Sequence, residues 1–206
     1  MPRIRVRIET LSDLIFGLAL SIGSIALVQH IPQAPADLYS DVVEFGFSFL
    51  IIVGVWLGYT RIVSVLPAES SGTIFLNLAL LFCVALEPFL YYVLFQATVP
   101  AFVDFASAAY ALDTGAMMGL LSGMMYLVVR QEGHAEVQKL DARSLRTFKV
   151  SMVAQGICAA LFLVSASDFF WIPVPGVSYL RFLLWYVALG VFFTTRAFVR
   201  RGAEKK

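Results

Sequence analysis

The residues of this chain best suited to do chemistry are ionic groups at the start of its first apolar segment. The stretch from Arg7 to Asp13 reads Arg-Ile-Glu-Thr-Leu-Ser-Asp, and a long apolar run follows it directly. A charged side chain costs about 2.5–3.5 kcal/mol at the centre of a membrane helix and less near its end, so it usually faces the protein interior and finds a partner. These groups can therefore join helices to one another or contact a passing ion.

Arg7, Ser12 and Asp13 form the polar motif of this segment, and we expect them mainly to hold the fold together. Arg7 and Asp13 are six positions apart, so they do not pair along one helix. Helical geometry turns Asp13 toward neighbouring helices, where Trp56 and Asn77 can donate hydrogen bonds. Direct handling of an ion by the motif stays open as a second interpretation.

A continuous aliphatic face follows the polar motif. At about 100° per residue, Leu14, Ile22 and Ile25 lie within about 40° of Leu18, and Ser21 lies about 60° from it. The Ser-Asp pair of the motif lies more than about 100° away. Such a face meets lipid or a partner helix, or it lines a narrow pore, because an apolar constriction can gate ion flow by dewetting. The pattern alone leaves these alternatives open.

The elements that must position these residues are membrane helices. Of the 206 residues, 60% are hydrophobic and 14% are charged, and the mean hydropathy is +0.83. A soluble domain is nearer about 25% charged, and a bilayer-spanning helix needs about 20 mostly apolar residues. We predict an all-α membrane protein, a single domain over residues 1–206, with six transmembrane helices. The approximate spans are 11–29, 42–60, 74–96, 106–129, 147–167 and 177–199.

A signal peptide is the alternative interpretation of the first apolar run, because three arginines precede it. The run has no small-residue cleavage site before Gln29, and it carries Asp13 near its start. We therefore expect this segment to be retained as the first helix.

The distribution of basic residues predicts the orientation in the membrane. In a six-span arrangement, 14 of the 15 Lys and Arg residues fall on one side, and Arg181 is the exception. Basic residues gather on the cytoplasmic side of membrane proteins. We therefore expect cytoplasmic N- and C-termini and a multi-pass protein of the cell inner (plasma) membrane.

The sequence argues against an intramembrane enzyme. No His lies within a predicted span, and neither a His-Glu-x-x-His nor a Gly-x-Ser-x-Gly pattern occurs. The two cysteines, Cys83 and Cys158, lack metal-ligand spacing, so we expect no metal site, no cofactor and no nucleic-acid partner. The carboxylates Glu87, Asp113 and Asp168 can be proton-relay groups, although satisfied or interfacial carboxylates are the simpler interpretation.

The order of several short motifs resembles a known family, the lysosomal and prokaryotic potassium channels of the transmembrane-protein-175 type. The family hallmark is an Arg, three residues and then Phe-Ser-Asp at the start of the first helix. This chain has Arg7, three residues and then Leu11-Ser12-Asp13, followed by Phe16. Leu11 therefore replaces the family Phe. The resemblance covers roughly residues 5–90, and the rest of the chain only by its topology.

Further motifs follow at the family's spacing in the second and third helices. The family often has a His shortly after the Trp of the second helix, where this chain has Gly58 and Tyr59. The matching positions are Ser48-Phe49, Trp56, Asn77-Leu78 and Pro88.

The resemblance implies a homotetramer in the lipid bilayer, with one six-helix unit per subunit and no pore-loop selectivity filter. In the family the first helix lines the pore, and its constriction is formed by bulky aliphatic residues five, nine and twelve positions after the motif Asp. In this chain these positions are Leu18, Ile22 and Ile25. The hydroxyl eight positions after the Asp is Ser21, which can offer oxygen contacts to a permeating cation.

The predicted function is a potassium-permeable cation channel, with K⁺ as the permeant ion and no cofactor. Other monovalent cations or protons stay open as further permeant ions. The alternatives are a secondary transporter and a non-conducting membrane protein of the same fold. Transporters often show inverted repeats and Gly/Pro-interrupted spans, and only Pro88 is such a break in this chain.

Overall fold

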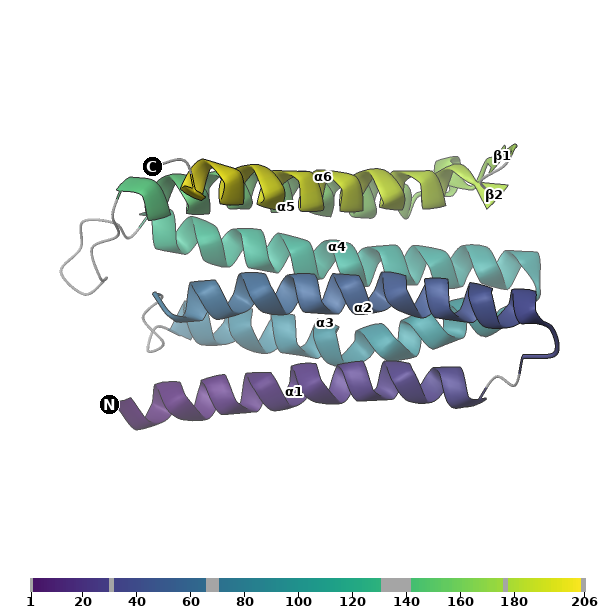
Figure 1. Ribbon diagram of the computed structural model, residues 1–206, viewed down its shortest axis with the longest axis horizontal. Coiled ribbons are helices and arrows are strands. Elements are labelled where there is room, and N and C mark those ends of the chain that lie inside the picture. The colour runs from purple at the N-terminus through teal and green to yellow at the C-terminus, as the bar shows by residue number, and fades with distance from the viewer. Residues whose placement is uncertain (1, 30–31, 66–70, 131–141, 176–177, 205–206) are drawn as a thin grey trace.

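Long helices that run side by side account for most of the chain (Figure 1). The computed structural model describes residues 2–29, 32–65, 71–130, 142–175 and 178–204. Its helices are α1 (Pro2–Gln29), α2 (Pro35–Val63), α3 (Ser71–Gln96), α4 (Pro100–Arg130), α5 (Ala142–Ser165) and α6 (Leu180–Glu204). A 3-10 turn, η1 (Asp168–Phe170), and two short strands, β1 (Pro173–Val174) and β2 (Ser178–Tyr179), join α5 to α6. The prediction of an all-α, six-helix fold is confirmed, with this small hairpin as an addition.

Five of the helices, α1 to α5, are long and apolar enough to cross a membrane. In α6 the apolar part is the shorter stretch Leu180–Thr195. The predicted sixth span began at residue 177, which was too early, because β2 pairs with β1 and the helix starts only at Leu180. The connection between the predicted fourth and fifth spans lies mostly outside the described residues, and α5 begins at Ala142, before the predicted start at residue 147.

The helices are ordered from α1 at one edge of the bundle to α5 and α6 at the other (Figure 1). Helix α1 packs on α2 and α3, α4 lies centrally against α2, α3 and α5, and α5 packs on α6. The α4–α5 contact is close because Gly115 faces Leu163, where a Cβ on the glycine would come within 2.8 Å of Leu163 Cγ. Small residues allow such close contact between membrane helices. This arrangement leaves one side of α1 uncovered.

Arg181, at the start of α6, is fully buried and ties α6 to the helices beside it. Its guanidinium forms an ion pair with Asp104 of α4 at 2.6 Å, donates to the carbonyl oxygen of Ser165 at 2.8 Å and lies 5.2 Å from the ring centre of Trp171. A buried charge is tolerated only when it is paired and hydrogen-bonded. The one basic residue that departs from the predicted charge distribution is thus neutralised inside the protein.

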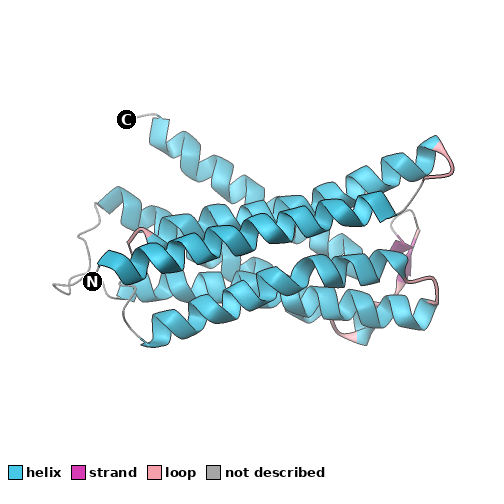
Figure 2. Cartoon of the chain, turned by 90° about the horizontal axis from the view of Figure 1, so that it is seen from below, coloured by secondary structure: helices cyan, strands magenta, loops and turns pink. Residues whose placement is uncertain are grey.

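The start of α1 and the end of α6 lie at the same end of the bundle (Figure 1). The hairpin between α5 and α6 lies at the opposite end (Figure 2). In the hairpin, Trp171 stacks on Tyr179 with ring centres 3.7 Å apart, and the amide of Leu180 donates to the carbonyl of Ile172. With both helix ends at one end of the bundle, any membrane orientation places the two chain ends on one side.

Candidate pore-lining helix

Helix α1 has two faces with opposite environments. Its packed face is buried against α2 and α3 and includes Ser12, Phe16 and Ala19. At about 100° per residue, this face lies opposite the aliphatic stripe that begins at Leu14. The orientation of α1 in the bundle therefore leaves the stripe outside the core of the single chain.

The stripe is exposed along its whole described length. The exposed fractions are 66% for Leu14, 57% for Leu18, 41% for Ile22 and 53% for Ile25. Exposed aliphatic side chains at successive helical turns form a continuous apolar surface, and such a surface meets lipid, another chain or a narrow pore. The chain thus presents the three predicted constriction residues, Leu18, Ile22 and Ile25, on one accessible face.

Ser21 lies beside the stripe and is also exposed. Its hydroxyl donates to the carbonyl oxygen of Gly17, one helical turn back, at 2.9 Å. This bond occupies the hydroxyl proton, so the lone pairs of Ser21 Oγ remain directed away from the helix. An oxygen in that state can accept a cation but has no proton to donate.

Asp13 is held by the second helix. The indole N–H of Trp56 in α2 donates to Asp13 Oδ1 at 3.1 Å. Trp56 and Asn77 were both expected to donate to Asp13. Trp56 makes this bond, whereas no hydrogen bond joins Asn77 to Asp13 among the described residues. Asn77 is instead buried and, together with Tyr59, lines a small cavity of about 20 Å³. Its Oδ1 has no partner among the described atoms.

Ser12 and Tyr59 form the buried contact between α1 and α2. Ser12 Oγ donates to the carbonyl oxygen of Ile8 at 2.8 Å and lies 2.6 Å from Tyr59 OH. The ring of Tyr59 also packs on Phe16, with centroids 5.6 Å apart. The sequence prediction missed Tyr59, although its spacing of three residues from Trp56 places both on one side of α2.

Arg7 is exposed at the start of α1, and it forms no ion pair or hydrogen bond with the described residues. The two ends of the polar motif therefore differ. Ser12 and Asp13 each contact α2, whereas Arg7 extends from the helix away from these contacts.

A buried carboxylate forms a second polar centre, between α2, α3 and α4. Glu87 is fully buried, and its Oε1 accepts hydrogen bonds from Ser48 at 2.7 Å and from Tyr110 at 2.9 Å. Its Oε2, like Asp113 Oδ2, has no partner among the described atoms. Glu87 is therefore an interior group and not an interfacial one. Its two donors were missed because they come from different helices.

The fold and its first helix define the class of the protein, which is a multi-pass α-helical membrane protein. Residues 7–88 match the model of the family described as the endosomal/lysosomal potassium channel TMEM175. This segment runs from Arg7 to Pro88 and contains all the motifs on which the resemblance rests. The resemblance to the transmembrane-protein-175 family is thereby confirmed. Because that family consists of channels, the prediction that the protein is not an enzyme is confirmed as well.

A solved structure has the same fold over almost the whole chain. It is a variant of the potassium channel MtTMEM175 in complex with a nanobody fusion protein. The two structures agree with a TM-score of 0.59 at 16% sequence identity, over 97% of this chain and 94% of that chain. No curated protein sequence matches the chain. The structural similarity extends the common fold to α4, α5 and α6, beyond the segment that the family model covers.

Proposed function

We propose that the protein is a potassium-permeable cation channel whose pore is lined by α1. The main support is the exposed aliphatic stripe on α1, which lies opposite the face by which that helix packs on α2 and α3. Bulky aliphatic side chains around a narrow axis form a constriction that controls ion passage by dewetting. Leu18, Ile22 and Ile25 are the constriction residues in this proposal.

One copy of α1 cannot enclose a pore, so the proposed channel is a homotetramer. Helix α1 lies at one edge of the bundle and α5 and α6 lie at the other (Figure 1). Rotational symmetry then brings four α1 stripes to a common axis, with α5 and α6 toward the lipid. This arrangement buries an apolar surface that a single chain leaves exposed.

Potassium is the proposed permeant ion because the matched family and MtTMEM175 are both described as potassium channels. Beside the constriction, Ser21 Oγ supplies an oxygen whose proton is already donated to Gly17. Four such oxygens around an axis replace part of the water shell of a cation that has lost its solvent in the constriction. Other monovalent cations and protons are possible further permeant ions.

The polar motif has a structural role in this proposal. Ser12 and Asp13 bind α2 through Tyr59 and Trp56, and these contacts fix the rotation of α1 about its own axis. A rotation by one residue, about 100°, would turn the constriction residues away from the pore. The distribution of basic residues supports a plasma-membrane protein with both chain ends in the cytoplasm.

Ion flux into liposomes that contain the purified protein tests the proposal. Potassium flux should exceed sodium flux, and a large organic cation should not pass. Size-exclusion chromatography with light scattering should give the mass of four 22.8 kDa chains. A well-folded oligomer with no flux of any cation would overturn the channel proposal and favour a transporter or a non-conducting protein of the same fold.

A further inference from the structure

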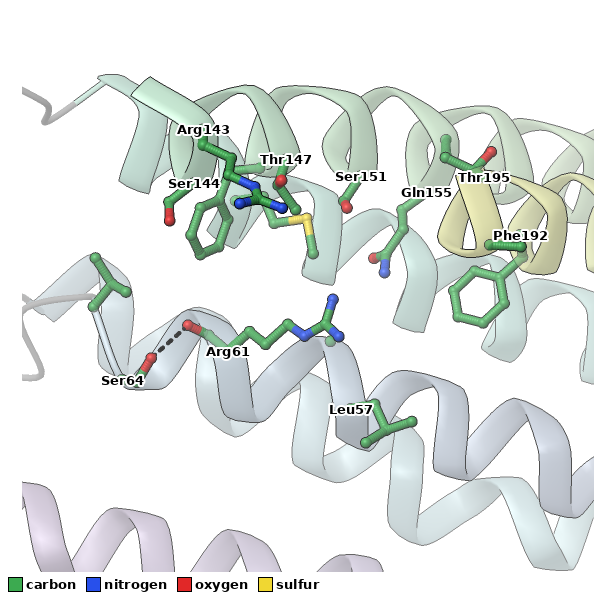
Figure 3. A pocket seen from close by; sticks show the side chains of 16 residues that line it. Leu57, Arg61, Ser64, Arg143, Ser144, Thr147, Ser151, Gln155, Phe192 and Thr195 are labelled. Atoms are coloured by element: carbon green, nitrogen blue, oxygen red, sulfur yellow. Dashed lines mark hydrogen bonds between the residues drawn. The ribbon is translucent and has the colours of Figure 1, made fainter. Parts of the chain in front are cut away.

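A large cavity lies between α2, α4, α5 and α6, away from the stripe on α1 (Figure 3). Its volume is about 740 Å³, and it lies at the end of the bundle where α2 ends and α5 begins. The positive-inside interpretation assigns this end to the cytoplasm. A cavity of this size accommodates a small organic group.

Two arginines from different helices face this cavity. Arg61 comes from the last turn of α2 and Arg143 from the first turn of α5, and both guanidinium groups point into the space between the helices (Figure 3). Neither forms an ion pair with any residue that the structure describes. Two like charges that converge with no Asp or Glu among the described residues lining the cavity favour an anionic occupant. Guanidinium groups suit phosphate oxygens because they donate in pairs.

Gln155 is a buried polar residue in the wall of the cavity. Its side chain is 2% exposed, lines the cavity and points into it (Figure 3). Its Oε1 has no hydrogen-bond partner among the described atoms. Buried carbonyl oxygens are nearly always satisfied, so this position calls for a donor from an occupant. A hydroxyl group is such a donor, and a phosphate oxygen is not.

The remaining walls divide into hydroxyl and apolar surfaces. Thr147 and Ser151 precede Gln155 along α5 at intervals of four residues, while Leu57 and Phe148 supply apolar surface from α2 and α5. Phosphate, hydroxyl and hydrocarbon are thus accommodated together. A free phosphate ion would leave the apolar walls without a partner.

We propose that this cavity binds the headgroup of an anionic phospholipid that carries a free hydroxyl. Arg61 and Arg143 hold the phosphate, a headgroup hydroxyl donates to Gln155 Oε1, and an acyl chain follows the apolar wall at Leu57. Basic pockets between membrane helices on the cytoplasmic side bind anionic lipid headgroups in this way. The inference does not rest on ion conduction, because lipid binding is measured without any flux.

Native mass spectrometry of the full-length protein in detergent tests the proposal, with dioleoylphosphatidylglycerol as the probe and dioleoylphosphatidylcholine as its neutral control. Phosphatidylglycerol should bind more tightly than phosphatidylcholine. Arg61→Gln and Arg143→Gln should each weaken the phosphatidylglycerol affinity about fivefold, which corresponds to one basic contact. Arg146→Gln is the matched control, because this exposed arginine of α5 does not line the cavity and should leave the affinity unchanged.

Unchanged phosphatidylglycerol affinity in the Arg61→Gln/Arg143→Gln double variant would overturn the proposal. So would glycerol 1-phosphate binding as tightly as the lipid, because a free phosphate compound would then be the occupant. Phosphatidylmethanol, a singly charged phosphodiester whose headgroup has no alcohol, tests the hydrogen bond to Gln155 on the unaltered protein. Phosphatidylglycerol should bind severalfold more tightly than phosphatidylmethanol, and Gln155→Met should abolish that difference. Equal binding of the two lipids by the unaltered protein would contradict the proposed hydrogen bond from a headgroup hydroxyl to Gln155.

Discussion

The indole of Trp56 donates a hydrogen bond to the carboxylate of Asp13 over 3.1 Å, and this bond joins α2 to α1. Asp13 lies on the side of α1 away from the stripe, next to the buried Ser12–Tyr59 contact. The two contacts hold α1 at successive residues, Ser12 and Asp13. They therefore determine which side of α1 remains exposed, and the stripe is the result.

Removal of the Trp56–Asp13 bond should loosen α1 without unfolding the bundle. Trp56→Phe retains the apolar ring and removes the donor, so we expect a loss of about 1 kcal/mol in the free energy of unfolding. A double-mutant cycle with Asp13→Asn, measured by thermal unfolding in detergent, should give a coupling energy of about 0.5–1 kcal/mol. Additive effects would show that the bond contributes nothing. An Asp13→Asn protein that assembles normally but conducts abnormally would instead favour direct ion handling.

Shortening the proposed constriction should widen it. In Leu18→Ala, the loss of most of the side chain at each of four positions should raise the potassium flux or lower the potassium-to-sodium ratio. Ile157→Ala is the control, because Ile157 is an exposed aliphatic residue of α5, at the other edge of the bundle. Equal flux and selectivity in the Leu18→Ala and unaltered proteins would remove Leu18 from the constriction.

Tyr59→Phe should destabilise the α1–α2 contact by about 1 kcal/mol. The substitution keeps the ring packing on Phe16 and removes only the hydroxyl that lies 2.6 Å from Ser12 Oγ. Tyr39→Phe is the control, because the side chain of Tyr39 is 74% exposed near the start of α2. Thermal unfolding in detergent should separate the two variants, and identical midpoints would show that the hydroxyl contact has no effect on stability.

Glu87 should be replaceable by Gln but not by Ala. Glu87→Gln retains an oxygen that accepts from Ser48 and Tyr110, whereas Glu87→Ala leaves both buried hydroxyls without that acceptor. Each unsatisfied hydroxyl costs about 1–3 kcal/mol, so Glu87→Ala should be the less stable variant by about 3 kcal/mol. Chemical denaturation in mixed micelles measures the difference. Equal stability of the two variants would mean that water or a rearranged side chain satisfies the hydroxyls.

Gly115→Ala should destabilise the α4–α5 contact. The added methyl would lie 2.8 Å from Leu163 Cγ and 3.2 Å from the backbone nitrogen of Leu163, so α5 itself would have to shift. Overpacking of this kind costs about 1–3 kcal/mol. Gly123→Ala is the matched control on the same helix, since an added Cβ there meets nothing within 4 Å, and it should be neutral or stabilising. A neutral Gly115→Ala would show that the two helices can separate at little cost.

The sequence predicted the number and order of the helices because membrane spans are the strongest signal that a sequence contains. Helical periodicity alone predicted that Leu18, Ile22 and Ile25 lie on one face of the first helix, and all three side chains are exposed in the structure. The start of α6 was misplaced because the two-residue strand Ser178–Tyr179 depends on pairing with β1, a contact that hydropathy does not contain.

The contacts of the polar groups were harder to predict from the sequence. Trp56 was expected as a donor to Asp13, but Tyr59 was not expected against Ser12. Ser48 and Tyr110 reach Glu87 from α2 and α4, so their meeting depends on how three helices pack together. Local periodicity gives the face of a helix on which a residue lies, and only tertiary packing determines which helix meets that face.

The burial of Arg181 has a consequence for the order in which the chain assembles. Its charge is satisfied by Asp104 and Ser107 of α4 and by Ser165 at the end of α5. All of these groups precede Arg181 in the chain, so they enter the bilayer earlier during synthesis. The guanidinium of Arg181 therefore has its partners in place only once α4 and α5 have packed together. Helix α6 can bury this charge without penalty only after that step. The acceptors in α4 and α5 thus make the final insertion step depend on correct packing of the part of the chain that has already been made.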